Sequence, residues 1–359
     1  MNDEFARRRD LIGAGLENRE LDAMLVTSRA SVRYLTGFTG SNGTVLALPG
    51  EAVFFTDPRY AIQSRREVSC RTQVCKGPIL TAVAATVAGK RLRRLGFEPA
   101  HLSYEGFDAL RANMPVNASL EPVSGWLEAH RMLKSPSEIE LIRRSVETNS
   151  KAFELAARRV RPGMSERDLA AEIDHQMRRL GAEKPSFETI VAYGERSALP
   201  HAHPTGAVLK SGQLVLVDMG AFQEGYASDM TRMLFLGAPA ARIQRLYRAV
   251  LEAQLAAIDA VRPGVTTAHV DRQARNVLKA YKLDRAFVHS TGHGLGLEIH
   301  ELPRIGKKDK TRLAAGMAIT IEPGVYLEGV GGIRIEDTVV VTATGCEVLT
   351  PTGKDLRVI

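Results

Sequence analysis

Residues Gln213–Leu234, QLVLVDMGAFQEGYASDMTRML, decide the fold of this chain. The stretch has two apolar segments, Leu214–Met219 and Tyr226–Leu234, and each has the length and composition of a β-strand. A short connection at Phe222–Gly225 lies between them and is typical of a turn. The stretch therefore predicts a β-hairpin in a half-buried sheet.

Each predicted strand carries one aspartate, Asp218 or Asp229, in apolar surroundings. If the turn is centred between Gln223 and Glu224, residues whose numbers sum to 447 face each other, and the two aspartates form such a pair. Directly opposed residues in an antiparallel pair have Cβ atoms about 5 Å apart. Two ionised carboxylates at that distance repel each other and are poorly solvated. The pair is therefore expected to share a proton or to hold cations.

The part of the sequence that contains this hairpin is repeated once. VRPGMS at 160–165 matches VRPGVT at 261–266, and LKSGQLVLVDMG at 209–220 matches LAAGMAITIEPG at 313–324. The second match places Asp218 on Glu322, an acid on an acid. The offsets, 101 and 104 residues, agree closely, so residues from about 134 onward are interpreted as a duplicated helix–helix–hairpin unit. Two halves facing each other across a pseudo-twofold axis would bring both acidic hairpins together.

Helix signals mark the two halves. The sequence Ser135-Pro136-Ser137-Glu138 predicts a helix start, with an N-cap serine, a proline in the first turn and a glutamate that reaches back. This helix is expected to end near Val160, and Ser165 caps a second one. In the second half, one amphipathic helix ends at Arg262-Pro263-Gly264 and another spans Thr267–Tyr281. The residues before Ser135 alternate short strands and helices and are interpreted as a separate α/β unit that ends near His130.

The second hairpin and the segment before it supply further chemistry. Glu322 and Glu336 belong to the hairpin, and His293 lies in HSTGHGLGLEIHE at 289–301. Three glycines within five residues of that segment argue against a helix and for close backbone packing. The glycine spacing and the absence of a lysine disfavour a nucleotide-binding loop.

Four carboxylates and one imidazole suit a pair of divalent cations; these groups belong to Asp218, Asp229, His293, Glu322 and Glu336. Oxygen ligands with one nitrogen match Mn²⁺, Co²⁺, Fe²⁺ or Zn²⁺. Two ions roughly 3.5–4 Å apart share a water, lower its pKa and stabilise a tetrahedral oxyanion. The alternative for each single acid is a surface position or an ion pair with Arg232 or Arg334. Five candidates at duplicated positions favour the metal site.

Composition limits the other functions. The chain has 359 residues, 25% of them charged and 44% apolar, which is typical of a soluble globular protein of two domains. Three cysteines without a CxxC motif suit a reducing compartment. No signal peptide and no apolar run of about 20 residues is visible, so we expect a cytoplasmic protein without a membrane partner. The net charge of +7 comes from scattered arginines with interleaved acids, which does not favour a nucleic-acid partner.

Five motifs resemble the M24 metallopeptidase family, in its Xaa-Pro aminopeptidase/prolidase branch (M24B): SALPHAHPT at 197–205, DMGAFQEGYASDMTR at 218–232, HSTGHGLGLEIHE at 289–301, TIEPGVY at 320–326 and GIRIEDT at 332–338. In addition, YLTGFTGS at 34–41 and FFTDPRY at 54–60 resemble the N-terminal domain of that branch. The resemblance covers essentially the whole chain. It implies an α/β (α+β) fold, with a creatinase-like N-terminal domain at 1–133 and a pita-bread catalytic domain at 134–359.

The resemblance also implies the ligands of two divalent metal ions per subunit, with manganese favoured over cobalt or zinc. The ligands would be Asp218, Asp229, His293, Glu322 and Glu336. Asp229 and Glu336 would bridge the two ions, and Glu322 could double as the general base.

Five further residues would surround the substrate. His201 would contact it near the scissile bond, with its neighbour His203 as the alternative, and His300 would steady the carbonyl or shuttle a proton. His289 would line the proline pocket, and its alternative is a packed core histidine. Tyr326 and Arg334 would support the substrate or its carboxylate, the alternative for Arg334 being an ion pair with Asp229 or Glu336.

The implied function is an Xaa-Pro aminopeptidase that hydrolyses the first bond of proline-containing peptides through attack by a metal-bridged hydroxide. The alternative is an Xaa-Pro dipeptidase (prolidase), which performs the same chemistry on dipeptides only. A non-catalytic binding module, or an enzyme for creatine-like substrates, is expected to lose the five ligands, which are all retained here. A methionine aminopeptidase would not need the N-terminal domain. The resemblance further implies a homodimer in which the N-terminal domain, near Arg59-Tyr60, shapes the partner's active-site mouth.

Overall fold

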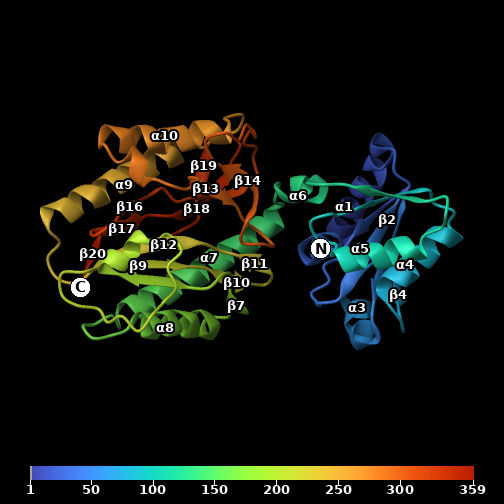
Figure 1. The fold of residues 1–359 in the computed structure, drawn as a ribbon, viewed down its shortest axis with the longest axis horizontal. Helices are drawn as coiled ribbons and strands as arrows, with labels where there is room; N and C mark the ends of the chain where they lie inside the picture. The colour runs from blue at the N-terminus through green and yellow to red at the C-terminus, as the bar shows by residue number, and fades with distance from the viewer. Residues whose placement is uncertain (1) are drawn as a thin grey trace. The chain divides into compact units, whose positions relative to one another are not determined.

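The computed structural model of the chain describes residues 2–359. It divides into two compact units, Met1–Arg131 and Met132–Ile359, which the ribbon shows in blue to cyan and in green to red (Figure 1). No helix in the described part of the chain is long and apolar enough to span a membrane.

The N-terminal unit is built on one mixed sheet with the strand order β4-β3-β2-β1-β5-β6. Its strands are β1 (Ala23–Val26), β2 (Gly43–Leu48), β3 (Glu51–Thr56), β4 (Arg71–Val74), β5 (Arg94–Phe97) and β6 (Ser119–Pro122). Strand β2 is antiparallel to β1 and β3, and the other pairs are parallel. The helices are α1 (Asn2–Gly15), α2 (Arg29–Thr36), α3 (Ala61–Glu67), α4 (Ile79–Gly89), α5 (Tyr104–Asn113) and α6 (Trp126–Arg131).

The second unit contains two pairs of helices that lie on opposite sides of its strands (Figure 1). Helix α7 (Pro136–Ala157) packs against α8 (Glu166–Arg179), and α9 (Ala241–Asp259) packs against α10 (Thr267–Ala280). The predicted start of α7 is confirmed, because Ser135 and Glu138 form a capping box with a proline in the first turn. Helices α7, α9 and α10 end within three residues of their predicted ends.

The strands of this unit form two larger sheets and two small ribbons. One sheet has the order β20-β12-β9-β8 and one ribbon has the order β11-β10-β7. These comprise β7 (Lys184–Pro185), β8 (Ile190–Tyr193), β9 (Leu214–Met219), β10 (Ala221–Gln223), β11 (Tyr226–Ala227), β12 (Met230–Phe235) and β20 (Arg357–Val358). The second sheet has the order β14-β13-β15-β18-β19, and β16 pairs with β17. These comprise β13 (Gly292–Gly294), β14 (Glu301–Ile305), β15 (Ala318–Ile321), β16 (Gly324–Leu327), β17 (Gly331–Arg334), β18 (Asp337–Val341) and β19 (Cys346–Val348).

The first hairpin has a register different from the predicted one. Its turn is centred between Glu224 and Gly225, which both have positive φ, 49° and 85°. Two-residue hairpin turns of this kind require positive φ at both central positions, which glycine adopts without strain. Asp218 is therefore opposite Thr231, and the prediction that it directly opposes Asp229 is wrong. Asp229 lies two residues before Thr231, so the aspartates are diagonal neighbours on one face.

The second hairpin repeats this construction, with β15 and β18 continued by β16 and β17 in one register. That register places Glu322 opposite Glu336, since Ile321 pairs with Asp337 and Gly324 with Arg334. The directly opposed acid pair therefore occurs in the second hairpin and not in the first.

The two hairpins meet through residues that the registers make equivalent. Thr231 corresponds to Glu336, and the Thr231 hydroxyl donates to Glu336 Oε2 at 2.7 Å. Arg232 corresponds to Asp337, and Arg232 Nη2 lies 2.7 Å from Asp337 Oδ1. Contacts between equivalent residues are what a pseudo-twofold axis between the hairpins produces, so the predicted duplication is confirmed.

Candidate functional site

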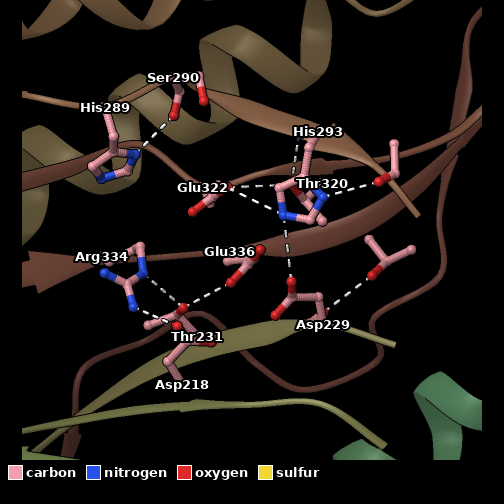
Figure 2. Close-up of polar contacts among 12 residues, drawn as sticks. Asp218, Asp229, Thr231, His289, Ser290, His293, Thr320, Glu322, Arg334 and Glu336 are labelled. Atoms are coloured by element: carbon pink, nitrogen blue, oxygen red, sulfur yellow. Dashed lines mark hydrogen bonds and ion pairs between the residues drawn. The ribbon is translucent and has the colours of Figure 1, made fainter. Parts of the chain in front are cut away.

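The five predicted ligands line one cavity of about 430 Å³ in the second unit. Figure 2 shows the first hairpin contributing its aspartates from one side and the second hairpin contributing its glutamates from the other. His293 lies on β13, whose glycines permit close approach: a Cβ on Gly292 would be 1.9 Å from the Thr320 carbonyl oxygen. The prediction of close backbone packing around these glycines is confirmed.

The ligand atoms lie at distances suited to shared cations. His293 Nε2 is 3.5 Å from Asp229 Oδ2 and 3.6 Å from Glu322 Oε1. One ligand atom each from Asp229, His293 and Glu336 falls within 4.8 Å of the others. The residue types, one imidazole among carboxylates, match divalent cations of the first transition row.

Three carboxylate oxygens of this group lack any hydrogen-bond donor among the described residues. Asp218 Oδ1, Asp229 Oδ1 and Glu336 Oε1 are all buried and unpartnered. An unsatisfied buried polar atom costs about 1–3 kcal/mol, and more when it is charged. Cations would satisfy all three oxygens, so the residues fit a metal centre.

Electrostatics leads to the same conclusion. Burial, together with repulsion from Glu336 and Asp218, raises the pKa of Asp229 well above its usual value, and Glu336 behaves likewise. Burial raises the pKa of Glu322 to about 8. Burial also lowers the pKa of His293 to about 4, which leaves the neutral imidazole that binds metals. Bound divalent cations would favour the ionised form of these acids and so offset the free-energy cost of ionising them.

Metal-free protein is therefore expected to lose stability as the pH rises from about 6.5, the ordinary pKa of the buried histidines, to about 8. The pKa of Glu322 has an ordinary value of 4.5 and is raised to about 8 by folding. The folded state binds more protons than the unfolded state in this range, so deprotonation favours unfolding. Thermal denaturation of chelator-treated protein across the range measures the effect. Saturating Mn²⁺ should abolish the decline, and a metal-free midpoint that rises with pH would contradict the expectation.

Arg334 connects the acidic group to two further predicted residues. It donates to Asp218 Oδ2 at 2.5 Å and to the Tyr326 hydroxyl at 2.6 Å, and Tyr326 in turn lies 2.9 Å from His289 Nε2. The ion pair considered for Arg334 exists, but its partner is Asp218 and not Asp229 or Glu336. Burial raises the pKa of Tyr326 to about 12, so its phenol stays neutral.

The histidines occupy distinct positions around the cavity. His300 stacks edge-on against His293 with ring centroids 4.5 Å apart. His201 lines the same cavity as His289 and His300. His203 instead pairs with Glu188 at 3.2 Å, and its side chain is 78% exposed. Both His201 and His203 line the cavity, so the choice of His201 as the substrate contact stays a prediction.

His289 is not a packed core histidine. Its ring lines the cavity and contacts Tyr326, and its backbone oxygen accepts a hydrogen bond from Arg275 at 2.6 Å. Arg275 is itself held by Asp271 on the same helix, α10, and Thr291 also donates to Asp271. The second helix pair therefore fixes the segment that carries His289.

Several residues of the site escaped sequence reasoning. Glu166 at the start of α8 is fully buried and accepts hydrogen bonds from the Tyr193 and Thr205 amides and from Arg196 Nε. It thereby holds the loop that carries His201, although in the sequence it resembles an ordinary acid of a first helical turn. Two apolar side chains and one arginine also line the cavity without belonging to any of the quoted motifs: Phe187, Ile190 and Arg304.

Comparison with known proteins gives consistent similarities. Residues 140–343 match Metallopeptidase family M24, and residues 8–133 match the Creatinase/Prolidase N-terminal domain. An Xaa-Pro dipeptidase of Pyrococcus horikoshii is 35% identical over 341 residues, which cover 95% of this chain and 96% of that protein. The structure of an Xaa-Pro dipeptidase from Bacillus anthracis matches with a TM-score of 0.96 at 37% identity, covering 99% of this chain and 100% of that one. An X-Pro aminopeptidase from Thermotoga maritima matches with a TM-score of 0.90 at 34% identity, covering 99% of each chain.

Proposed function

The chain belongs to metallopeptidase family M24, and we propose that it is an Xaa-Pro dipeptidase, which hydrolyses the bond before proline in dipeptides. Its fold is a creatinase-like N-terminal domain followed by a pita-bread catalytic domain. The relatives described above as dipeptidases support the alternative reading of the sequence over the aminopeptidase placed first. The observation that carries the proposal is an exposed arginine, Arg304, on the wall of the acidic cavity.

Arg304 would recognise what distinguishes a dipeptide from a longer peptide. It lies on β14, and its side chain makes no hydrogen bond or ion pair with another residue of the described chain. A free carboxylate directly after proline exists only in a dipeptide. Guanidinium groups bind carboxylates in a fixed two-pronged geometry. The apolar side chains of Phe187 and Ile190 line the same cavity and suit a pyrrolidine ring, which has no N–H to be recognised.

The metal ligands in this proposal are five acidic and histidine residues that line the cavity: Asp218, Asp229, His293, Glu322 and Glu336. Two divalent ions held there supply a Lewis acid and a water of lowered pKa. Manganese is the preferred ion, because four of the five ligands are hard carboxylates, with cobalt and zinc as alternatives.

The remaining steps belong to the side chains. The Glu322 carboxylate is 16% exposed, more than Asp218 or Asp229, so it can accept the proton of the attacking water. The water oxygen bonds to the carbonyl carbon of the first residue, the C–N bond to proline breaks, and the proline nitrogen takes up the proton. Burial and the charge of His201 lower the pKa of His300, so His300 is neutral and can donate a hydrogen bond to the developing oxyanion.

The aminopeptidase is the second candidate, because a protein named X-Pro aminopeptidase shares the fold over 99% of both chains. The test compares Xaa-Pro with Xaa-Pro-Xaa carrying the same first residue, in the presence of Mn²⁺. A dipeptidase should give a much higher kcat/KM on the dipeptide. Equal or faster tripeptide cleavage would establish the aminopeptidase instead. The homodimer and the cytoplasmic location stay predictions from the sequence.

A further inference from the structure

The N-terminal unit contains a second group of metal-ligating side chains, far in the sequence from the catalytic motifs. Glu98 and His101 follow β5, and Glu128 lies on α6. One ligand atom from each of the three falls within 4.8 Å of the other two. None of them takes part in the chemistry proposed above.

Glu98 points to a ligand that the protein itself does not provide. The residue is only 2% exposed. Its Oε2 accepts hydrogen bonds from the Thr27 and Ser28 amides at 2.7 and 2.9 Å, whereas its Oε1 is buried without a partner. The nearby Ser31 hydroxyl lowers the pKa of Glu98 by polar interaction, but neither this hydroxyl nor Glu98 Oε1 makes a hydrogen bond of normal geometry. A buried carboxylate oxygen without a donor is costly.

The other two side chains are placed as ligands rather than as a close ion pair. His101 Nε2 lies 3.5 Å from Glu128 Oε1, which is long for a charge-assisted hydrogen bond. Two ligands bound at about 2.1 Å to one tetrahedral ion are separated by about 3.4 Å. The His101 and Glu128 side chains are 29% and 26% exposed, so an ion can reach the site and retain a water.

We propose that Glu98, His101 and Glu128 bind one divalent transition-metal ion, with Zn²⁺ as the preferred occupant. Two carboxylates neutralise its charge, and the imidazole favours zinc over magnesium or calcium. The ion would join the segment after β5 to α6, the last helix of the unit. All three ligands lie within Met1–Arg131, so this site shares no residue with the catalytic centre.

The test measures bound zinc in the full-length chain after chelation, reconstitution with Zn²⁺ and dialysis. We expect His101→Ala and Glu128→Gln to hold one equivalent less than the unmodified protein and to retain dipeptide hydrolysis. Glu98→Gln should lose the same equivalent, although its amide oxygen can still accept from Thr27 and Ser28. The matched control is His175→Ala, an exposed histidine on α8 outside both clusters, which should keep the full zinc content.

The result depends on the difference in bound zinc between the unmodified protein and each variant, and not on the total zinc that either protein binds. If the catalytic centre bound no zinc, the unmodified chain would still hold one equivalent more than His101→Ala. Equal zinc content in these two proteins would overturn the proposal. So would a zinc-induced rise in the thermal midpoint that is as large in His101→Ala as in the unmodified chain, since an ion at this site stabilises the fold that binds it.

Discussion

Asp229→Asn is expected to lower kcat/KM for Xaa-Pro dipeptides by on the order of a thousandfold or more. Metal ions supply several kcal/mol of transition-state stabilisation, and each 1.36 kcal/mol corresponds to about a tenfold change in rate. Asp229 is 5% exposed and one of its carboxylate oxygens lacks any donor among the described residues, so this oxygen is available to a cation. Steady-state kinetics with saturating Mn²⁺ measure the loss of activity, and metal analysis measures the loss of bound metal.

The same variant should not destabilise the metal-free protein. Repulsion from Glu336 and Asp218 contributes to the raised pKa of Asp229, and a neutral amide removes that repulsion. If the variant loses activity while its thermal midpoint without metal is unchanged or higher, the defect lies in metal binding and not in folding. The control is Glu224→Gln at the exposed turn of the same hairpin, which should retain activity. Near-normal turnover by Asp229→Asn would refute its assignment as a ligand.

Arg304→Ala should lower kcat/KM for an Xaa-Pro dipeptide by about 10- to 100-fold, because a hydrogen bond to a charged group contributes about 1.5–3 kcal/mol. The corresponding Xaa-Pro amide has no carboxylate and should be cleaved equally well by the variant and the original enzyme. The ratio of kcat/KM for the dipeptide to kcat/KM for the amide therefore measures carboxylate recognition directly. For Arg304→Lys, kcat/KM on the dipeptide should lie between the values of the original enzyme and Arg304→Ala, since lysine keeps the charge and lacks the two-pronged geometry.

Lys310→Ala is the matched control for Arg304. It removes an exposed cation from the same segment, outside the catalytic cavity, and should leave the ratio of dipeptide to amide unchanged. If Arg304→Ala lowered kcat/KM equally for the dipeptide and the amide, Arg304 would support the structure of the enzyme rather than bind the substrate carboxylate. A tripeptide that responds like the dipeptide would argue against the proposed selectivity.

The predictions that held rest on local rules. The start of α7 followed from Ser135 and Glu138, because capping depends on residues three apart. The acidic hairpins were identified from the duplication, since Asp218 and Glu322 fall at matched positions. The register was wrong by one position at the turn, because an interpretation from polarity alone did not require positive φ at Glu224 and Gly225.

The residues that escaped prediction depend on contacts distant in the sequence. Arg304 is an exposed arginine among many, and only the fold places it on the cavity wall. Glu166 accepts from Thr205, which is 39 residues away. An ion pair of Arg334 was considered only as an alternative to a role with the substrate, and its partner Asp218 is 116 residues away.

Arg232 shows that the two halves cannot be separated, despite their common construction. This fully buried guanidinium donates to Thr231 in its own hairpin, and its other acceptors all belong to the other half: the Glu336, Thr352 and Gly353 backbone oxygens and the Asp337 carboxylate. A half-length fragment would bury this charge without its partners, which costs several kcal/mol. The repeat is therefore not an autonomous folding unit, and the catalytic domain should unfold as one cooperative body.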